Sequence, residues 1–507
     1  MNPKIFLPLT MAAVAGSASA QEARPNIILF MVDDMGWQDT SVPFWRDTTS
    51  YNRMYDTPNM ERLAKQGMKF TQAYACSISS PSRCSLLTGA NNARHRVTNW
   101  TLQKDMSTDI ESDEVSLPEW NVNGISMEEG TEHTFVGTSF VDVLRRAGYS
   151  TIHCGKAHFG AEGTPGADPL HFGFEVNIAG HAAGGLATYL SELNYGHTAD
   201  GKPTSLMSIP GLEKYWGSGV FVTEALTREA LSALDSVKES GKPFFLYMSH
   251  YAVHIPIDKD LRYYDGYIAK GLSEKDAAYA SLIRGMDKSL GDILDWLEAN
   301  GEAGNTIVIF MSDNGGLATQ PYWRDGEPFT QNAPLNSGKG SLYEGGVREP
   351  MIVRWPGVVD SSSVCDHYLM IEDFYPSILE MAGINQESPA GVDGVSFVPL
   401  LKGTGDPSEG RALVWNFPNI WGNDGPGINL NCAIRKGDWK LVYYYQTGRK
   451  ELFNISEDIG EETDLSGINP LKVVELSSEL GKYLRSVGAD RPYFKGSGKP
   501  CPWPDEL

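Results

Sequence analysis

The sequence predicts an α/β fold in which a mostly parallel sheet lies between layers of helices. Continuous apolar runs recur along the chain, and such runs are typical of strands that are buried on both faces. Helical patterns lie between these runs, and this alternation indicates right-handed crossover connections within one sheet. With 507 residues and 41% hydrophobic content, the chain can form one large domain and a smaller one.

Each expected element follows from its local pattern. The strands expected in the large sheet are, in chain order, 26–32, 150–152, 244–249, 306–312 and 351–355. The helices expected to cover this sheet are 58–66, 139–147, 222–238, 277–298 and 373–381. Residues 403–410 are rich in Gly and polar residues, which indicates a linker. After this linker we expect short strands at 412–417, 431–435 and 440–445 and a closing helix at 471–487.

Two of the expected strands end on acidic and amide side chains. Asp33 and Asp34 follow strand 26–32, and Asp313 and Asn314 follow strand 306–312. Ligands of doubly wound sheets bind beyond the carboxyl ends of the strands, so these groups should meet at one edge. Their hard oxygen atoms suit Ca²⁺ or Mg²⁺ better than zinc. The alternative is a pair of unrelated solvated turns.

Basic and imidazole groups follow two further strands. The strand that begins at residue 150 leads to Lys156 and His158, and strand 244–249 leads to His250 and His254. We expect these groups at the same edge as the acids. Each has a structural alternative, such as a surface lysine or a hydrogen-bonded histidine, and His250 is close enough to His254 in the chain to exchange roles with it.

The N-terminus predicts a cleavable secretory signal over residues 1–20. Lys4 supplies a basic start, residues 5–15 are mostly apolar, and Ala18-Ser19-Ala20 fits a cleavage site with small residues. An unprocessed apolar strand is the alternative. No later stretch approaches the roughly 18 to 20 apolar residues that span a bilayer. We therefore expect a periplasmic or otherwise secreted protein that begins near Gln21 and has no membrane span.

Charge and cysteine content narrow the possible partners. The formal net charge of −22 argues against nucleic acid, because phosphate binding needs clustered Lys and Arg. An anionic substrate would need a local basic pocket.

Six dispersed cysteines fit neither a disulfide framework nor a zinc motif, although one or two disulfides are allowed in an exported protein. The oligomeric state is left open.

The most informative segment runs from Ser79 to Gly89. Ser80 can cap a helix whose first residue is Pro81, and Gly89 stands where that helix should end. Ser79 then lies beside the positive end of the helix, where a developing anion is stabilised. Ser79-Ser80-Pro81-Ser82-Arg83 and Leu87-Thr88-Gly89 resemble the sulfatase signature, Cys or Ser-x-Pro-x-Arg followed by Leu-Thr-Gly.

The wider resemblance is to type I sulfatases of the alkaline phosphatase-like superfamily and covers nearly the whole chain. Segments that match family blocks in order are 26–34, 57–59, 155–156, 312–315, 338–340, 343–348, 393–396 and 434–441. Two departures stand out. Ala157 replaces the usual tryptophan between Lys156 and His158, and Asn416 and Asn419 stand where many relatives carry histidines. We therefore infer no substrate contact from the last block.

The resemblance implies the nucleophile and a metal site. Ser79 would be oxidised to formylglycine (3-oxoalanine), and one hydroxyl of the aldehyde hydrate would attack the sulfate ester. One Ca²⁺ ion would be held by Asp33, Asp34, Ser79, Asp313 and Asn314. A serine at this position implies an anaerobic radical maturase that acts on the unfolded chain before export.

The resemblance also implies five further catalytic residues. Arg83 would hold the hydrate in place, and Lys156 and Lys339 would bind sulfate oxygens. His254 would be the general acid for the leaving alkoxide. His158 would take a proton from the second hydroxyl, which expels sulfate and regenerates the aldehyde.

The fold implied by the resemblance is a mixed, mostly parallel sheet in a catalytic domain over residues 21–403. A smaller antiparallel sheet with a helix would follow over residues 404–507. The implied substrate is a sulfated glycan, and the block at 153–166 resembles galactose- or N-acetylgalactosamine-directed relatives. Trp323, Arg324 and Asp325 are expected sugar contacts.

Two other classes of protein fit parts of the pattern. One is a phosphatase or phosphodiesterase of the same superfamily with Ser79 as a plain nucleophile, but such enzymes usually bind two zinc ions through several histidines. The other is a non-catalytic glycan-binding protein that has kept the fold. A Ser79→Ala variant separates these classes from a sulfatase, because a binding module would lose no function, whereas a sulfatase would lose turnover and keep its ligand.

Overall fold

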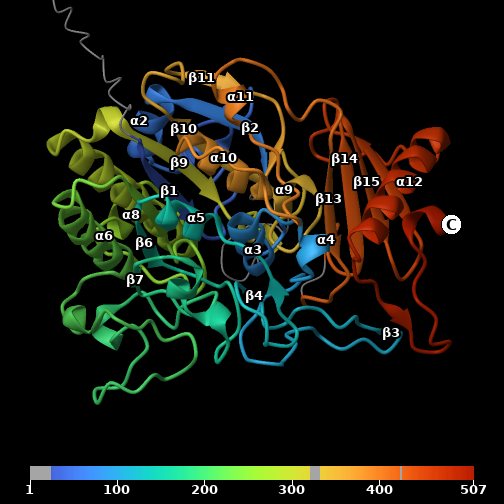
Figure 1. Ribbon diagram of the computed structural model, residues 1–507, viewed down its shortest axis with the longest axis horizontal. Coiled ribbons are helices and arrows are strands. Elements are labelled where there is room, and N and C mark those ends of the chain that lie inside the picture. The colour runs from blue at the N-terminus through green and yellow to red at the C-terminus, as the bar shows by residue number, and fades with distance from the viewer. Residues whose placement is uncertain (1–23, 320–331, 423–424) are drawn as a thin grey trace, which may run out of the picture.

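The computed structural model describes residues 24–319, 332–422 and 425–507 (Figure 1). The expected signal segment 1–20 and the expected sugar contacts Trp323, Arg324 and Asp325 lie outside these residues. None of the described helices is long and apolar enough to cross a membrane. All six cysteines are buried and unpaired, so the allowed disulfides do not form here.

The large sheet has the order β11-β2-β10-β9-β1-β8-β6-β7, and β12 pairs with β2. Its strands are β1 (Asn26–Val32), β2 (Met68–Tyr74), β6 (Ser150–Gly155), β7 (Val176–Ile178), β8 (Phe244–Ser249), β9 (Thr306–Ser312), β10 (Arg348–Arg354), β11 (Ser363–Cys365) and β12 (Leu369–Met370). The strands from β9 to β7 are mutually parallel, whereas β10 is antiparallel to both β9 and β2. The expected mixed, mostly parallel sheet is therefore confirmed.

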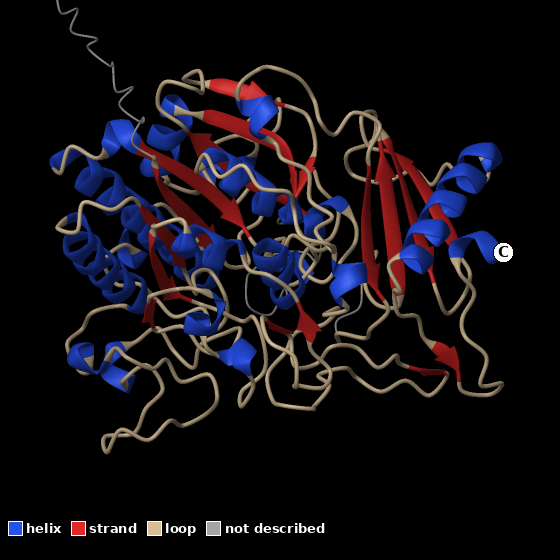
Figure 2. Cartoon of the chain, viewed as in Figure 1, coloured by secondary structure: helices blue, strands red, loops and turns tan. Residues whose placement is uncertain are grey.

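Helices cover both faces of this sheet (Figure 2). One layer contains α2 (Pro58–Gln66), α6 (Val222–Lys238), α7 (Tyr264–Ala269) and α8 (Glu274–Ala299), and the other contains α3 (Ser79–Thr88), α5 (Phe140–Arg146) and α10 (Phe374–Met381). In β1, Ile27 and Leu29 pack into the core under α3, whereas Ile28 and Phe30 pack into the core under α8. This alternation explains why the strand is apolar at every position.

A second, antiparallel sheet follows in chain order. It consists of β13 (Ala412–Phe417), β14 (Asn431–Lys436), β15 (Trp439–Tyr444) and β16 (Lys450–Asn454), with α12 (Pro470–Ser486) on its outer face (Figure 1). Leu476 and Leu480 of α12 pack on that face. Trp415 and Phe417 point the other way and join the core of the large sheet. The expected C-terminal sheet with a closing helix is confirmed.

Short elements complete the described chain. They are α1 (Ser50–Met54), α4 (Asn92–His95), α9 (Glu344–Val347), α11 (Val398–Leu401), β3 (Val115–Ser116), β4 (Ile125–Ser126), β5 (Phe135–Val136) and β17 (Tyr493–Phe494).

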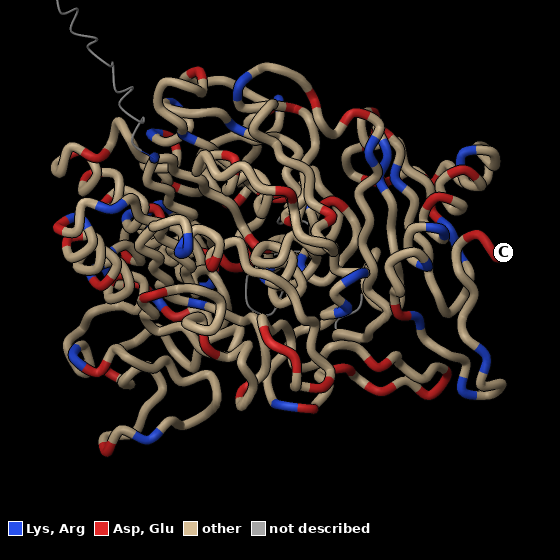
Figure 3. The backbone as a smooth tube through the Cα atoms, viewed as in Figure 1, with Lys and Arg blue, Asp and Glu red and all other residues tan. Residues whose placement is uncertain are grey.

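Lys and Arg are scattered among Asp and Glu along the backbone (Figure 3). An anionic substrate is therefore met by particular local cations rather than by a broad basic surface.

The start of α3 differs from the expectation. The helix begins at Ser79, not at Pro81, and no side chain caps it. The Ser80 hydroxyl instead accepts a hydrogen bond of 3.1 Å from the backbone N–H of Thr101, so it is not available to cap the helix. Gly89 ends the helix as expected, in the left-handed conformation with φ of 67°.

Candidate active site

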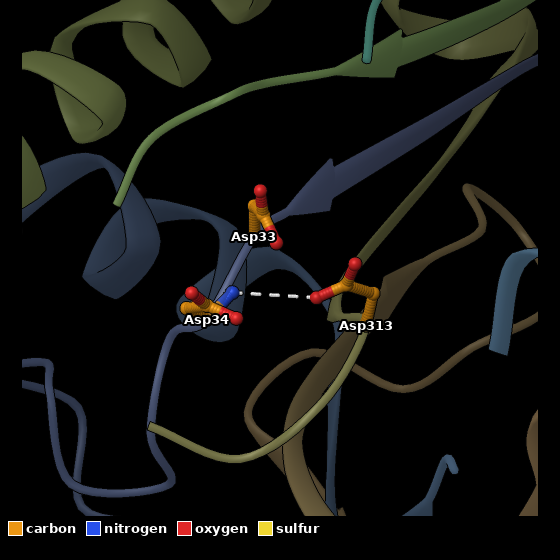
Figure 4. A group of neighbouring side chains, drawn as sticks. All are labelled: Asp33, Asp34 and Asp313. Carbon is orange, nitrogen blue, oxygen red and sulfur yellow. Dashed lines mark hydrogen bonds between the residues drawn. The ribbon is translucent and has the colours of Figure 1, made fainter. Parts of the chain in front are cut away.

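Three carboxylates meet at the carboxyl ends of β1 and β9. Val32 pairs with Ser312 in register, so Asp33 and Asp313 leave the two strands side by side. The carboxylates of Asp33, Asp34 and Asp313 are fully buried, and each offers an oxygen within 4.8 Å of the others. The backbone N–H of Asp34 donates to Asp313 Oδ1 at 3.3 Å (Figure 4). The expected convergence of the acids is thus observed.

Two buried lysines contact these acids. Lys156 Nζ lies 2.7 Å from Asp33 Oδ2, and Lys339 Nζ lies 2.8 Å from Asp34 Oδ2. Burial would raise the pKa of Asp34, but Lys339 and other cations outweigh it and hold that pKa well below its usual range. Burial also lowers the pKa of Lys156. The two ammonium groups therefore depend on their carboxylate neighbours to remain charged.

Ser79 lies within this cluster. Its Oγ accepts a hydrogen bond of 2.8 Å from Lys156 Nζ and donates one of 3.2 Å to Asn314 Oδ1. A weaker contact of 3.4 Å joins the same oxygen to Asp33 Oδ1. The first residue of α3 is thus in direct contact with groups from three different strand ends.

Arg83 lies one helical turn further along α3 and is fully buried. Its Nε donates to Asp313 Oδ2 at 2.8 Å, and its Nη1 donates to Ser249 Oγ at 2.6 Å and to the Lys156 carbonyl at 3.0 Å. These bonds fix Asp313 and the main chain at Lys156. None of the hydrogen bonds that Arg83 makes with described residues goes to Ser79 Oγ. The expected role of Arg83 in holding the nucleophile therefore stays a prediction.

Two histidines reach the same place. His158 Nε2 lies 3.0 Å from the Thr101 carbonyl, so Nε2 carries the proton and Nδ1 is left as an acceptor. His254 Nδ1 lies 2.7 Å from the Ile255 carbonyl, and its Nε2 lies 3.8 Å from Asp34 Oδ2. Burial lowers the pKa of both rings, that of His254 to about 3. Neutral rings with one free nitrogen each are suited to proton transfer.

His250 is placed elsewhere. It is buried against Phe30, with ring centroids 5.1 Å apart, and its Nε2 lies 2.9 Å from Ser289 Oγ. It therefore packs in the core between the sheet and α8, and His254 is the histidine of this segment that lines the site.

A cavity of about 370 Å³ opens above the cluster. Ser79, His158, His254 and Lys339 line it, together with Ile78, Trp100, Ile110, Gly184, Gly185, Met207, Ile255, Trp421 and Gly422. The two tryptophans were missed at the level of sequence, although Trp421 follows the block at 415–419 closely. Because single tryptophans in loops are common, only their meeting in space singles them out.

Asn416 and Asn419 do not line this cavity. Asn416 Nδ2 donates to the Asp490 carbonyl at 3.0 Å, and its Oδ1 accepts from the Tyr445 hydroxyl at 2.6 Å. Asn419 Nδ2 donates to Asp109 Oδ2 at 3.1 Å. Both amides hold protein segments together, which agrees with inferring no substrate contact from this block.

A model of the Sulfatase family matches residues 25–384, well over half of the chain. The chain belongs to the sulfatase family. A second model, described as N-sulphoglucosamine sulphohydrolase, C-terminal, matches residues 338–489 of this sulfatase. The expected family is therefore confirmed, and the protein is an enzyme that hydrolyses sulfate esters.

Individual relatives cover almost the whole enzyme. A sulfatase of Formosa agariphila is 30% identical over 95% of this chain and 92% of its own. The mouse N-acetylgalactosamine-6-sulfatase is 29% identical over 91% of this chain and 80% of its own. The crystal structure of Ps i-CgsB in complex with k-i-k-neocarrahexaose superimposes with a TM-score of 0.71 at 26% identity, over 91% of this chain and 93% of that one.

Proposed function

We propose that this sulfatase removes sulfate from a sulfated glycan of galactose or N-acetylgalactosamine type, with a formylglycine made from Ser79 as nucleophile. The observation that carries the proposal is the position of Ser79 Oγ, 2.8 Å from a buried lysine and at the floor of the cavity. The glycan class is supported by two relatives, one named N-acetylgalactosamine-6-sulfatase and one crystallised with a neocarrahexaose.

Maturation at Ser79 fits the burial of this residue. The side chain begins a helix that is buried along its whole length, and the residue is only 4% exposed. A modifying enzyme could reach it only before the chain folds, as expected for a radical maturase that acts before export. The modification supplies a geminal diol, of which one hydroxyl attacks sulfur and the other allows sulfate to be expelled.

The donor set fits one divalent cation. Asp33, Asp34 and Asp313 offer carboxylate oxygens, and Asn314 and residue 79 add uncharged oxygens, which are the ligands that Ca²⁺ prefers. The three carboxylates are already balanced by Arg83, Lys156 and Lys339. A bound Ca²⁺ ion would thus make the site net positive, which attracts a sulfate ester and favours a deprotonated nucleophile.

The remaining roles follow from where the side chains lie. Lys156 contacts Asp33 and Lys339 contacts Asp34, and both lysines would bind sulfate oxygens as negative charge shifts onto them. His254 keeps the proton on Nδ1 against the Ile255 carbonyl, so it would first take up a second proton at Nε2 and then donate that proton to the leaving sugar oxygen. The free Nδ1 of His158 would accept the proton of the second hydroxyl. Arg83 would act by holding Asp313 and Lys156 in place.

Mass spectrometry of the protein exported by an anaerobic host with its own maturase tests the proposal. A tryptic peptide that contains residue 79 should be lighter than the serine form by two hydrogen atoms, or should appear as the aldehyde hydrate. The same preparation should release sulfate from galactose 6-sulfate or N-acetylgalactosamine 6-sulfate. An unmodified serine in a host that matures other sulfatases would contradict the proposed nucleophile. Hydrolysis of phosphate esters in place of sulfate esters would contradict the proposed reaction.

The N-terminal segment supports the proposed compartment. We infer that residues 1–20 direct export and that the mature enzyme acts in the periplasm or outside the cell. N-terminal sequencing of the exported protein should begin near Gln21.

A further inference from the structure

The cavity that Ser79 lines also has apolar side chains in its wall. Six of the described lining residues carry apolar side chains: Ile78, Trp100, Ile110, Met207, Ile255 and Trp421. Apart from the histidines, Lys339 is the one charged side chain among the lining residues that the structure describes. The wall therefore offers contact area rather than charge to whatever carries the sulfate.

Trp421 is seated directly beside a catalytic lysine. A methyl group at Gly340 would lie 2.3 Å from Cε3 of the indole, so this part of the ring packs directly against the glycine that follows Lys339. Lys339 Nζ is 5.9 Å from the centroid of the Trp421 ring. The backbone N–H of Trp421 donates to Asn429 Oδ1 at 2.8 Å, which fixes the loop at that point.

Trp100 is tied to the nucleophile helix through the next residue. The Thr101 N–H donates to Ser80 Oγ at 3.1 Å, and the Thr101 carbonyl lies 3.0 Å from His158 Nε2. The indole of Trp100 therefore lines the cavity from a main-chain segment that is anchored to α3 and to a catalytic histidine.

One carboxylate joins the two tryptophan-bearing segments. Asp109 Oδ1 accepts from Asn99 Nδ2 at 2.7 Å, and Asp109 Oδ2 accepts from Asn419 Nδ2 at 3.1 Å. Asn99 directly precedes Trp100, and Asn419 lies two residues before Trp421. The N–H of Ile110 also donates to the Ile420 carbonyl at 3.0 Å. Asp109 and Ile110 thus hold the two tryptophan-bearing segments side by side, although these segments come from distant parts of the chain.

We propose that Trp100 and Trp421 form a saccharide subsite in which they pack on the apolar C–H face of the sulfated sugar ring, with Asp109 as a positioning residue. Aromatic side chains provide a large, rigid contact area, and pockets of this kind use a few polar groups to fix orientation. The apolar side chains of the described wall offer contact area rather than charge, which suits the C–H face of a hexose or N-acetylhexosamine ring. This inference rests on the proposed function.

Binding measured without turnover tests the subsite. Ser79→Ala protein, which cannot be matured at this position, is titrated with N-acetylgalactosamine 6-sulfate in a calorimeter. Adding Trp100→Ala or Trp421→Ala should weaken binding about tenfold each, and Trp421→Phe should restore most of the loss. Trp45 is a partly exposed tryptophan outside the cavity, so Trp45→Ala should leave the Kd for the sugar sulfate unchanged. Correctly folded alanine variants that bind as tightly as the parent, or a parent that does not bind the sugar, would overturn the subsite.

Turnover distinguishes the subsite from the proposed function. In the matured enzyme the tryptophan variants should raise KM for the sugar sulfate more than they lower kcat. They should raise KM for a simple alkyl sulfate, which has no ring, much less than KM for the sugar sulfate. Asp109→Asn replaces one acceptor oxygen with a donor and should give the same split between KM and kcat. Tryptophan-dependent binding without any sulfate release would remove the proposed function and keep the subsite. Sulfate release with an unchanged KM in the tryptophan variants would keep the proposed function and overturn the subsite.

Discussion

Lys156 and Ser79 are joined by a hydrogen bond of 2.8 Å from Nζ to Oγ. The same ammonium group lies 2.7 Å from Asp33 Oδ2, and both side chains of that ion pair are fully buried. The strand end at Gly155 therefore brings a cation to Ser79, the proposed nucleophile, at the start of α3. One lysine can orient the nucleophile, balance an acid and receive a sulfate oxygen.

Replacing this lysine should lower catalysis strongly. In the Lys156→Ala variant a preorganised donor is lost, and kcat should fall by about 10²- to 10³-fold. The measurement is sulfate release by protein whose Tm is determined in parallel, because Asp33 loses its buried partner. Lys499→Ala, at an exposed position, should leave kcat unchanged. A folded Lys156→Ala enzyme with parental kcat would contradict the role.

Removal of the proposed Ca²⁺ ion should lower stability as well as activity. A ligand that binds only the folded state adds about 2.7 kcal/mol when its free concentration is roughly 100-fold above Kd, so chelation should lower Tm and added Ca²⁺ should restore it. In Asp313→Asn the Tm should respond little to chelator or to Ca²⁺. The exposed Asp265→Asn variant should respond like the parent. A parental Tm that is indifferent to both would argue against a calcium site.

Gly184 should be intolerant of a methyl group. A Cβ at this position would lie 2.0 Å from Cε1 of His158, so Gly184→Ala must displace the ring. We expect kcat to fall by about 10²- to 10⁴-fold, the usual contribution of a general base, while the fold is kept. Gly266→Ala is the matched control, because nothing lies within 4 Å of the added carbon. Equal activity of the two variants would show that His158 does not act as the base.

The stability of the enzyme should depend on pH through Glu372. Burial, reinforced by Asp373, raises the pKa of this carboxyl to about 8. The folded state therefore holds the proton over a pH range in which the unfolded chain has released it. Its contribution to stability is full at low pH and declines as the pH rises from about 4.5 toward 8, by roughly 1.4 kcal/mol per pH unit at most.

Glu372→Gln should remove this dependence, because a glutamine oxygen can still accept the bond of 2.9 Å from Asn91 Nδ2. In urea denaturation, the variant should gain stability relative to the parent between pH 5 and pH 8. Glu387→Gln, on the surface, should follow the parent at both values. A constant difference in unfolding free energy between the parent and the Glu372→Gln variant across this range would contradict the raised pKa.

Local sequence was sufficient for the elements of the core. The bounds of β1, β8, β9, α2 and α6 agree with the expected ranges at every residue. Strands buried on both faces must be apolar throughout, and amphipathic helices repeat with their own period, so each pattern records its surroundings directly. The acids at the ends of β1 and β9 could be placed for the same reason.

Other elements depended on partners that the local pattern does not record. β2 mixes apolar and polar residues because it is only partly covered, and it was not expected. The same holds for β16 at the edge of the second sheet, and the antiparallel direction of β10 follows from its connection rather than its composition.

What the sequence by itself determined was the family, the class of fold, and which polar and charged residues stand at the strand ends. The resemblance already implied His254 rather than His250, and the structure places His254 in the cavity. Only the tertiary structure decided that Trp100 and Trp421 line the same cavity as Ser79. The apolar pattern of the sequence predicts the strands, and backbone hydrogen bonds between neighbouring strands then align their ends. Loop side chains that are far apart in sequence meet only through specific contacts, such as those of Asp109, which no periodicity encodes.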